Sequence, residues 1–180
     1  MYRYIFEDAR QIPPFNQPAS LLTIGTTPLK LHQEEVFVRY FRGNLTLAAT
    51  FPWHEREQIR TVQGPAIVYS DNLWFDDEFF SEFMNRAEQS GRACRAAFPA
   101  DAPAFRAYTL PLAQNFERGR DSEGRPIYLV DLWYFPQGYD REIVPVVISS
   151  DCEEMGYYSV PDFMTMEQGQ LTHYGTLRAV

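Results

Sequence analysis

The first hundred residues alternate between strand-like and helix-like hydrophobic patterns, and this alternation constrains the fold most strongly. The strand-like segments are short and rich in β-branched and aromatic residues; they cover residues 1–6, 45–50, 65–70 and 93–98. Between them, apolar residues recur at three- and four-residue spacing in residues 28–41 and 75–87, and residues 53–60 are a further candidate for a helix of about two turns. Strands joined through helices pair in parallel. The pattern predicts an α/β fold with a mainly parallel sheet and flanking helices.

The second half of the chain is richer in strand-like segments. Residues 105–116, 127–135 and 142–149 are strand-like, and the charged, glycine-containing residues 117–125 predict a long hairpin loop between the first two. We therefore expect an antiparallel β extension. The chain is predicted to be a single domain over residues 1–180, with an α/β half at 1–100 and a β-rich extension at 101–180.

Composition and charge exclude several classes of function. The chain has 180 residues, with 24 acidic and 16 basic side chains and a net charge of −8, which disfavours nucleic acid as a partner. The sequence lacks an apolar run of the roughly 20 residues that a membrane span needs. Two cysteines cannot build a disulfide framework, and acidic residues stand near the N-terminus where a signal peptide is apolar. We expect a cytoplasmic protein.

Polar residues at two junctions are candidates for a ligand site. Asp71 and Asn72 follow the predicted strand at 65–70, and ligands of open α/β sheets bind beyond the carboxyl ends of strands. A carboxylate there is a suitable ligand for Mg²⁺, although Asp and Asn also commonly shape a turn or begin a helix. Gly25 lies in the loop before the helix at 28–41, where exposed amides suit an anion or a base edge; the alternative is a plain strand–turn–helix junction.

Taken together, two segments resemble the sugar-1-phosphate nucleotidyltransferases. Residues 17–33 have the sequence QPASLLTIGTTPLKLHQ and are similar to the family segment usually written RPKALLPIGNKPLLEHQ. Residues 65–76 resemble the family's strand that ends in Gly-Asp, here Ser70-Asp71. The resemblance covers about residues 1–100, in the family's order. It implies a GT-A-like, Rossmann-like nucleotide-binding fold, in which a sugar 1-phosphate attacks the α-phosphate of an NTP with Mg²⁺ bound.

The resemblance also implies roles for individual residues. Asp71 corresponds to the metal-binding aspartate, and Arg10 matches the arginine of the family's glycine-rich loop, a catalytic residue near phosphate. Gly25 and Asn72 become candidates for binding the substrate, a nucleotide or nucleotide sugar. A second metal carboxylate is expected from the later strands, and Asp131 is the best candidate because an acid inside an apolar run needs a partner. Alternatively, the strand exposes Asp131 at an edge, or Asp131 shares a face with its apolar neighbours.

Departures from the family pattern keep a second hypothesis open. Residues 6–13 contain no glycine, and the two lysines of the family segment that matches residues 17–33 are Ala19 and Thr27 here. Phosphoryl transfer depends on positive charge around the phosphates, so these losses predict weakened catalysis. The rival hypothesis is a catalytically eroded assembly, scaffold or regulatory subunit with a protein partner or a homo-oligomeric state. A third places a docking surface on the aromatic loop at residues 134–139.

Overall fold

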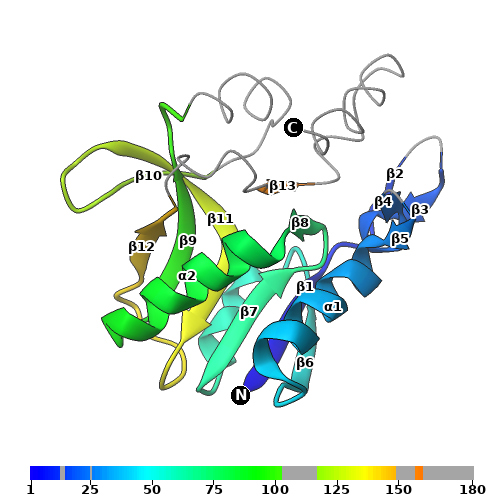
Figure 1. The fold of residues 1–180 in the computed structure, drawn as a ribbon, viewed down its shortest axis with the longest axis horizontal. Helices are drawn as coiled ribbons and strands as arrows, with labels where there is room; N and C mark the ends of the chain where they lie inside the picture. The colour runs from blue at the N-terminus through cyan, green and yellow to red at the C-terminus, as the bar shows by residue number, and fades with distance from the viewer. Residues whose placement is uncertain (13–14, 25, 103–116, 149–156, 160–180) are drawn as a thin grey trace.

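The computed structural model describes residues 1–12, 15–24, 26–102, 117–148 and 157–159 (Figure 1). The elements of the N-terminal part are β1 (Tyr2–Glu7), β2 (Gln11–Ile12), β3 (Gln17–Pro18), the 3-10 helix η1 (Ala19–Leu21), β4 (Thr23–Ile24), β5 (Thr27–Pro28), α1 (Leu29–Phe41), β6 (Thr46–Pro52) and the 3-10 helix η2 (Arg56–Thr61). They are followed by β7 (Ala66–Ser70), β8 (Leu73–Phe75), α2 (Asp77–Ser90), β9 (Cys94–Pro99), β10 (Glu117–Arg120), β11 (Pro126–Phe135), β12 (Val144–Val147) and β13 (Tyr157–Ser159).

A seven-stranded sheet forms the centre of the molecule. Its strand order is β12-β9-β11-β7-β1-β6. β10 pairs with residues 126–129 of β11. β1 pairs in parallel with both β6 and β7, and β12 pairs in parallel with β9. β11 runs antiparallel to its neighbours β7, β9 and β10. The predicted α/β fold with a mainly parallel sheet is confirmed.

The position of β11 joins the two halves of the chain into one sheet. Leu132 pairs with Tyr69 of β7 on one side, and Trp133 pairs with Arg95 of β9 on the other. The antiparallel strand of the second half therefore lies inside the sheet, between strands of the first half. The strand expected at residues 105–116 lies outside the described residues.

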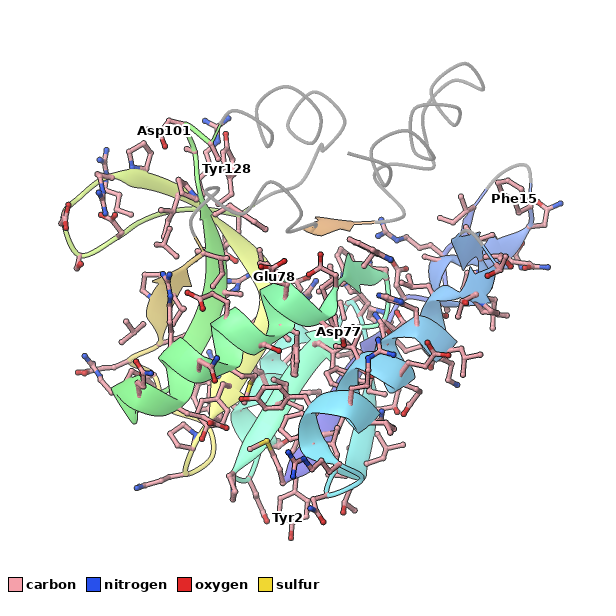
Figure 2. All side chains as sticks on the ribbon, viewed as in Figure 1. Tyr2, Phe15, Asp77, Glu78, Asp101 and Tyr128 are labelled. Carbon is pink, nitrogen blue, oxygen red and sulfur yellow. The ribbon has the colours of Figure 1, made fainter. Side chains whose placement is uncertain are left out.

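Both α-helices cover the same face of the sheet (Figure 1). Of the apolar stripe predicted over residues 75–87, α2 buries Phe79, Phe80, Phe83, Met84 and Ala87 there, whereas Phe75 is the last residue of β8 and precedes the helix. The Asp76 carboxylate accepts a 2.8 Å hydrogen bond from the Phe79 N–H and so caps α2, which Gly91 ends in the left-handed region. Arg39 of α1 donates to Asp77, which lies between the helices in Figure 2. Neither α-helix of the described chain is long and apolar enough to cross a membrane.

Three local expectations differ from the observed elements. The helix expected at residues 53–60 is the 3-10 helix η2, which has no buried residue and therefore no apolar stripe to anchor an α-helix. The hairpin loop expected at 117–125 begins as strand β10, and only its remainder is a turn. Pro28, expected in the first turn of its helix, precedes α1 as the N-cap residue.

The opposite face of the sheet holds a second apolar cluster around Phe6, Trp133 and Phe135. The aromatic loop packs here: the Tyr139 N–H donates to the Val62 carbonyl oxygen at 2.9 Å, and Tyr139 contacts this cluster. Gly64 lies so close to Gly138 that a Cβ atom on Gly64 would stand 2.1 Å from the Gly138 nitrogen. The loop thus packs partly against its own sheet, and the docking surface on it stays a hypothesis.

Candidate functional site

A cluster of buried polar side chains lies at the carboxyl ends of the neighbouring strands β1 and β7. Asp8 comes directly after β1, and Asp71 and Asn72 come directly after β7, whose last residue pairs with Phe6 of β1. The exposed fractions are 2% for Asp8, 7% for Asp71 and 3% for Asn72. Buried carboxylates are rare unless they are paired or bind a metal, so this cluster is the candidate site.

The Asp71 carboxylate is held by neutral donors. The Asp8 backbone N–H donates to Asp71 Oδ1 at 2.8 Å, and the buried Ser20 side chain also hydrogen-bonds to this carboxylate. Burial raises the pKa of Asp71 from 3.8 to about 6, and the nearby Asp8 and Glu7 charges add to the rise. Among the described residues, no Lys, Arg or His side chain forms an ion pair with the Asp71 carboxylate.

The Asp8 carboxylate has a different environment. Arg10 Nε and one terminal nitrogen donate to both Asp8 oxygens at 2.6–3.0 Å, and Asn72 Nδ2 donates to Asp8 Oδ2 at 2.9 Å. Burial alone would raise the pKa of Asp8, but the hydrogen bonds from Arg10 and Asn72 outweigh it and lower the pKa below its usual value. Asp8 stays ionised and paired.

The Asn72 side chain has one unused hydrogen-bonding group. Its Nδ2 atom faces the Asp8 carboxylate, which fixes the orientation of the amide, and its Oδ1 atom is buried without a hydrogen-bond partner among the described residues. A buried amide oxygen without a partner costs free energy. The site therefore contains two carboxylates and one buried amide oxygen that can still accept a hydrogen bond or bind a cation.

Gln33 of α1 fixes the turn that carries Asp71 and Asn72. Its side-chain amide, 1% exposed, donates to the Leu73 carbonyl oxygen at 2.6 Å and to the Asp71 carbonyl oxygen at 3.3 Å. The Asp71 carbonyl belongs to the tight connection between β7 and β8, and Leu73 is the first residue of β8. A helix that packs on the sheet thus sets the geometry of the candidate site.

Arginine and tryptophan side chains line one side of the cluster. The Arg10 guanidinium lies 4.5 Å from the centre of the Trp53 ring, and the Arg56 guanidinium lies 4.6 Å from the same ring. Arg10 is 49% exposed, whereas its partner Asp8 is almost fully buried. The guanidinium of Arg10 therefore stands between the buried carboxylate and solvent.

Asp131 belongs to a separate ion-pair network on β11. Its carboxylate pairs with Arg56 and, at 3.0 Å, with Arg95, and it accepts a 3.2 Å hydrogen bond from the Ser70 hydroxyl. The partner that an acid in an apolar run requires is thus supplied by two guanidiniums. The structure does not bring Asp131 into the Asp8–Asp71 cluster, and its predicted role as a metal ligand stays a prediction.

Sequence reasoning found part of this site. It singled out Asp71, Asn72 and Arg10, which the structure brings together, whereas Gly25 lies outside the described residues. It missed Asp8 as a functional residue, although the rule that selected Asp71 applies equally to an aspartate directly after β1. No sequence signal identified Ser20 or Gln33, because their roles depend on which backbone atoms the fold brings near them.

The donor set fits a hard divalent cation. Two carboxylates and one amide oxygen are the kinds of oxygen ligand that Mg²⁺ and Ca²⁺ take. Within the described residues, no three His, Cys, Asp or Glu side chains come together as a metal-binding group. The Asn72 oxygen would add a third oxygen ligand, and it has no hydrogen-bond partner among the described residues.

Comparison with known proteins supports the fold. No protein-family model and no curated protein sequence matches the chain. A solved structure from Bacillus anthracis, described as a glucose-1-phosphate thymidylyltransferase in complex with a sucrose, matches 98% of this chain and 94% of its own, with a TM-score of 0.54 at 10% sequence identity. The chain therefore has a nucleotidyltransferase-like fold, as the sequence resemblance implied.

A second solved structure, a hypothetical transferase from Thermus thermophilus, matches 75% of this chain and 64% of its own. The identity is 13% and the TM-score is 0.46, a likeness too weak to carry an inference.

Proposed function

We propose that this chain binds a nucleotide or a nucleotide sugar together with Mg²⁺ at the carboxyl ends of β1 and β7. The observation that carries the proposal is the cluster of Asp8, Asp71 and Asn72, three polar side chains each less than one-tenth exposed, where the fold presents ligands. A site that served only to shape a turn would not need two buried carboxylates and an unpartnered amide oxygen.

The roles of individual residues follow from their chemistry. Asp71 is the carboxylate that holds the cation, and Asn72 adds an amide oxygen beside it. Arg10 is exposed enough to reach phosphate oxygens and keeps its charge at any physiological pH. When bound, Mg²⁺ neutralises phosphate oxygens. The reaction that this arrangement serves is transfer of a nucleotidyl group to a sugar 1-phosphate.

A second candidate function is binding without transfer, in a regulatory, scaffold or assembly subunit with a protein partner or as a homo-oligomer. The observation that favours it is Ala19, which is fully buried among Ile12, Leu22 and Leu29. In the resembling family a lysine stands at this position, and here an apolar methyl group belongs to a small buried cluster. The chain would then bind a nucleotide but lack the positive charge that transfer requires.

We also propose that residues 1–180 act as one domain in the cytoplasm. The insertion of β11 between β7 and β9 supports a single unit, because neither half of the chain contains a complete sheet. The thiol of Cys94 is free and buried, which is compatible with a reducing compartment.

A thermal-shift experiment with the purified chain tests binding. NTPs, nucleotide sugars and sugar 1-phosphates are each added with and without Mg²⁺, to wild type and to Asp71→Asn. A ligand at about 100 times its dissociation constant adds close to 2.7 kcal/mol, or several degrees for a chain of this size. We expect a shift for one nucleotide class that requires Mg²⁺ and is lost in Asp71→Asn. No shift with any ligand contradicts the proposal.

Product analysis separates transfer from binding. An NTP that gives a shift is incubated with sugar 1-phosphates and Mg²⁺, and pyrophosphate and nucleotide sugar are measured by chromatography. Formation of both products in wild type but not in Asp71→Asn supports the transferase. Binding without products supports the eroded subunit.

A further inference from the structure

The candidate site carries more negative than positive charge. Asp8 and Asp71 are both buried, and Arg10 supplies one positive charge through its ion pair with Asp8. Among the described residues no Lys, Arg or His forms an ion pair with Asp71, whose hydrogen-bond donors are the Asp8 N–H and Ser20. A single guanidinium therefore balances half of the charge that two carboxylates carry when both are ionised.

Arg10 is placed so that it can leave Asp8. Its side chain is half exposed while the carboxylate beneath it is buried, so the ion pair opens toward solvent without disturbing the core. The Trp53 ring, 4.5 Å from the guanidinium, offers a surface on which Arg10 can stay stacked after the pair opens. The uncovered carboxylate would then keep the hydrogen bond from Asn72 Nδ2, and the same amide carries the unpartnered Oδ1 atom.

We propose that Asp8 is the second carboxylate ligand of the divalent cation and that Arg10 occupies the cation's place on Asp8 until the cation binds. This inference rests on the proposed function, and it goes beyond it by placing the second ligand on β1 rather than on the later strands. Arg10, displaced from Asp8, turns to the phosphate groups of the nucleotide.

The exchange makes the cation and the nucleotide depend on each other. The cation alone must break the Arg10–Asp8 pair. A nucleotide alone draws Arg10 away and leaves Asp8 buried and unpaired, which is costly. When both bind, Asp8 faces the cation and Arg10 faces phosphate, so each ligand raises the affinity for the other.

Metal titration without nucleotide tests this directly. Mn²⁺, which substitutes for Mg²⁺ and is visible by electron paramagnetic resonance, is titrated into the full-length wild type and the Arg10→Ala variant. Removing the competing guanidinium should tighten Mn²⁺ binding by about tenfold, within the range typical of coupled sites. The same variant should bind the Mn²⁺–nucleotide complex more weakly than wild type. Unchanged or weaker Mn²⁺ binding by Arg10→Ala overturns the proposal.

A matched control and a second variant secure the result. Arg125 also pairs with a shielded aspartate, Asp121, whose oxygens accept two further backbone N–H groups, so Arg125→Ala should leave Mn²⁺ affinity unchanged. Adding Asp8→Asn to the Arg10→Ala variant should abolish the gain in Mn²⁺ affinity; a gain that persists overturns the role of Asp8.

The proposed function and the exchange of Arg10 for the cation can be contradicted separately. If wild type binds no nucleotide under any condition, the proposed function fails, while tighter Mn²⁺ binding by Arg10→Ala still supports the exchange. If wild type binds a Mg²⁺–nucleotide complex and Arg10→Ala gains no Mn²⁺ affinity, the proposed function stands and the exchange is wrong.

Discussion

Replacing Asp71 by asparagine measures how much the ionised carboxylate lowers the free energy of unfolding. Asparagine keeps the shape, and its Oδ1 can still accept the Asp8 N–H hydrogen bond. The pKa of Asp71 rises from 3.8 to about 6 in the folded chain, a difference of about two units. At 1.36 kcal/mol per unit, the ionised form destabilises the fold by about 3 kcal/mol at neutral pH.

The sign of the pH dependence follows from the direction of the shift. Between about pH 4 and pH 6 the folded chain binds a proton at Asp71 that the unfolded chain has already lost. The free energy of unfolding contributed by Asp71 therefore falls as pH rises through this window. Below pH 4 both states are protonated, and above pH 6 both are ionised, so the contribution is constant outside the window.

Urea or thermal unfolding of the two proteins at pH 4.5 and pH 7.5, without metal, measures this effect. We expect Asp71→Asn to be more stable than wild type by about 1–3 kcal/mol at pH 7.5, which corresponds to a few degrees in Tm. At pH 4.5 the difference should become much smaller. A variant less stable than wild type at pH 7.5, or a difference independent of pH, would refute the reasoning.

Asp121 supplies the opposite case as a control. Burial would raise its pKa slightly, but hydrogen bonds from the Arg125 side chain and from backbone N–H groups lower it. Its contribution to stability is present above its unfolded pKa and is lost as pH falls. Asp121→Asn should therefore destabilise the chain at pH 7.5 and less so in acid, a slope opposite to that of Asp71→Asn.

Three further substitutions test other parts of the structure. Gln33→Met leaves buried carbonyl oxygens at Asp71 and Leu73 unsatisfied, so it should cost about 1–3 kcal/mol in urea unfolding and reduce the nucleotide-dependent thermal shift. Asp131→Asn removes the shared partner of Arg95, which is 12% exposed, and should cost about 2 kcal/mol while the Mg²⁺-dependent shift persists. Gly64→Ala should cost about 3 kcal/mol, because the new Cβ overlaps the Gly138 backbone.

For each of these substitutions, one result would contradict the prediction. A Gln33→Met chain with unchanged ligand binding would show that the turn holds its geometry without α1. Loss of the Mg²⁺-dependent shift in Asp131→Asn, at a temperature where the variant is folded, would return Asp131 to the metal site. Gly43→Ala places its Cβ in open space but strains the backbone at a φ of +79°, so it measures backbone strain without overlap. A Gly64→Ala chain as stable as wild type would show that the overlap with Gly138 is relieved at no cost.

The fold was predictable where one periodicity dominates a segment. Local sequence patterns predicted the apolar stripe of α2, its end at Gly91 and the apolar run of β7. The folded structure agrees with these patterns. The α-helix expected at residues 53–60 was mispredicted because its two apolar side chains, Trp53 and Ile59, stand six positions apart and do not form a helical stripe. In the folded chain Trp53 is covered by two arginines instead.

The candidate site was predictable only as far as strand ends reveal it. Asp71 could be found because a clear strand precedes it, and the same reasoning applied to β1 would have found Asp8. The pairing of Arg10 with Asp8 was not foreseen, since the acids near Arg10 suggest repulsion of phosphate until one of them is seen to be neutralised. The arginine partners of Asp131 come from η2 and β9. They are so far from Asp131 along the chain that no local sequence pattern predicts these ion pairs.

The place of β11 in the sheet has a consequence for the nascent chain. When residue 100 has been synthesised, β1, β6, β7 and β9 exist, but the strand that separates β7 from β9 does not. At roughly 5–20 residues per second, the chain reaches residue 135 roughly 2–7 s later. During that interval one side of β7, whose five residues are all buried in the finished sheet, is an unprotected apolar edge. We therefore expect the arrival of β11 to close this edge in the growing polypeptide.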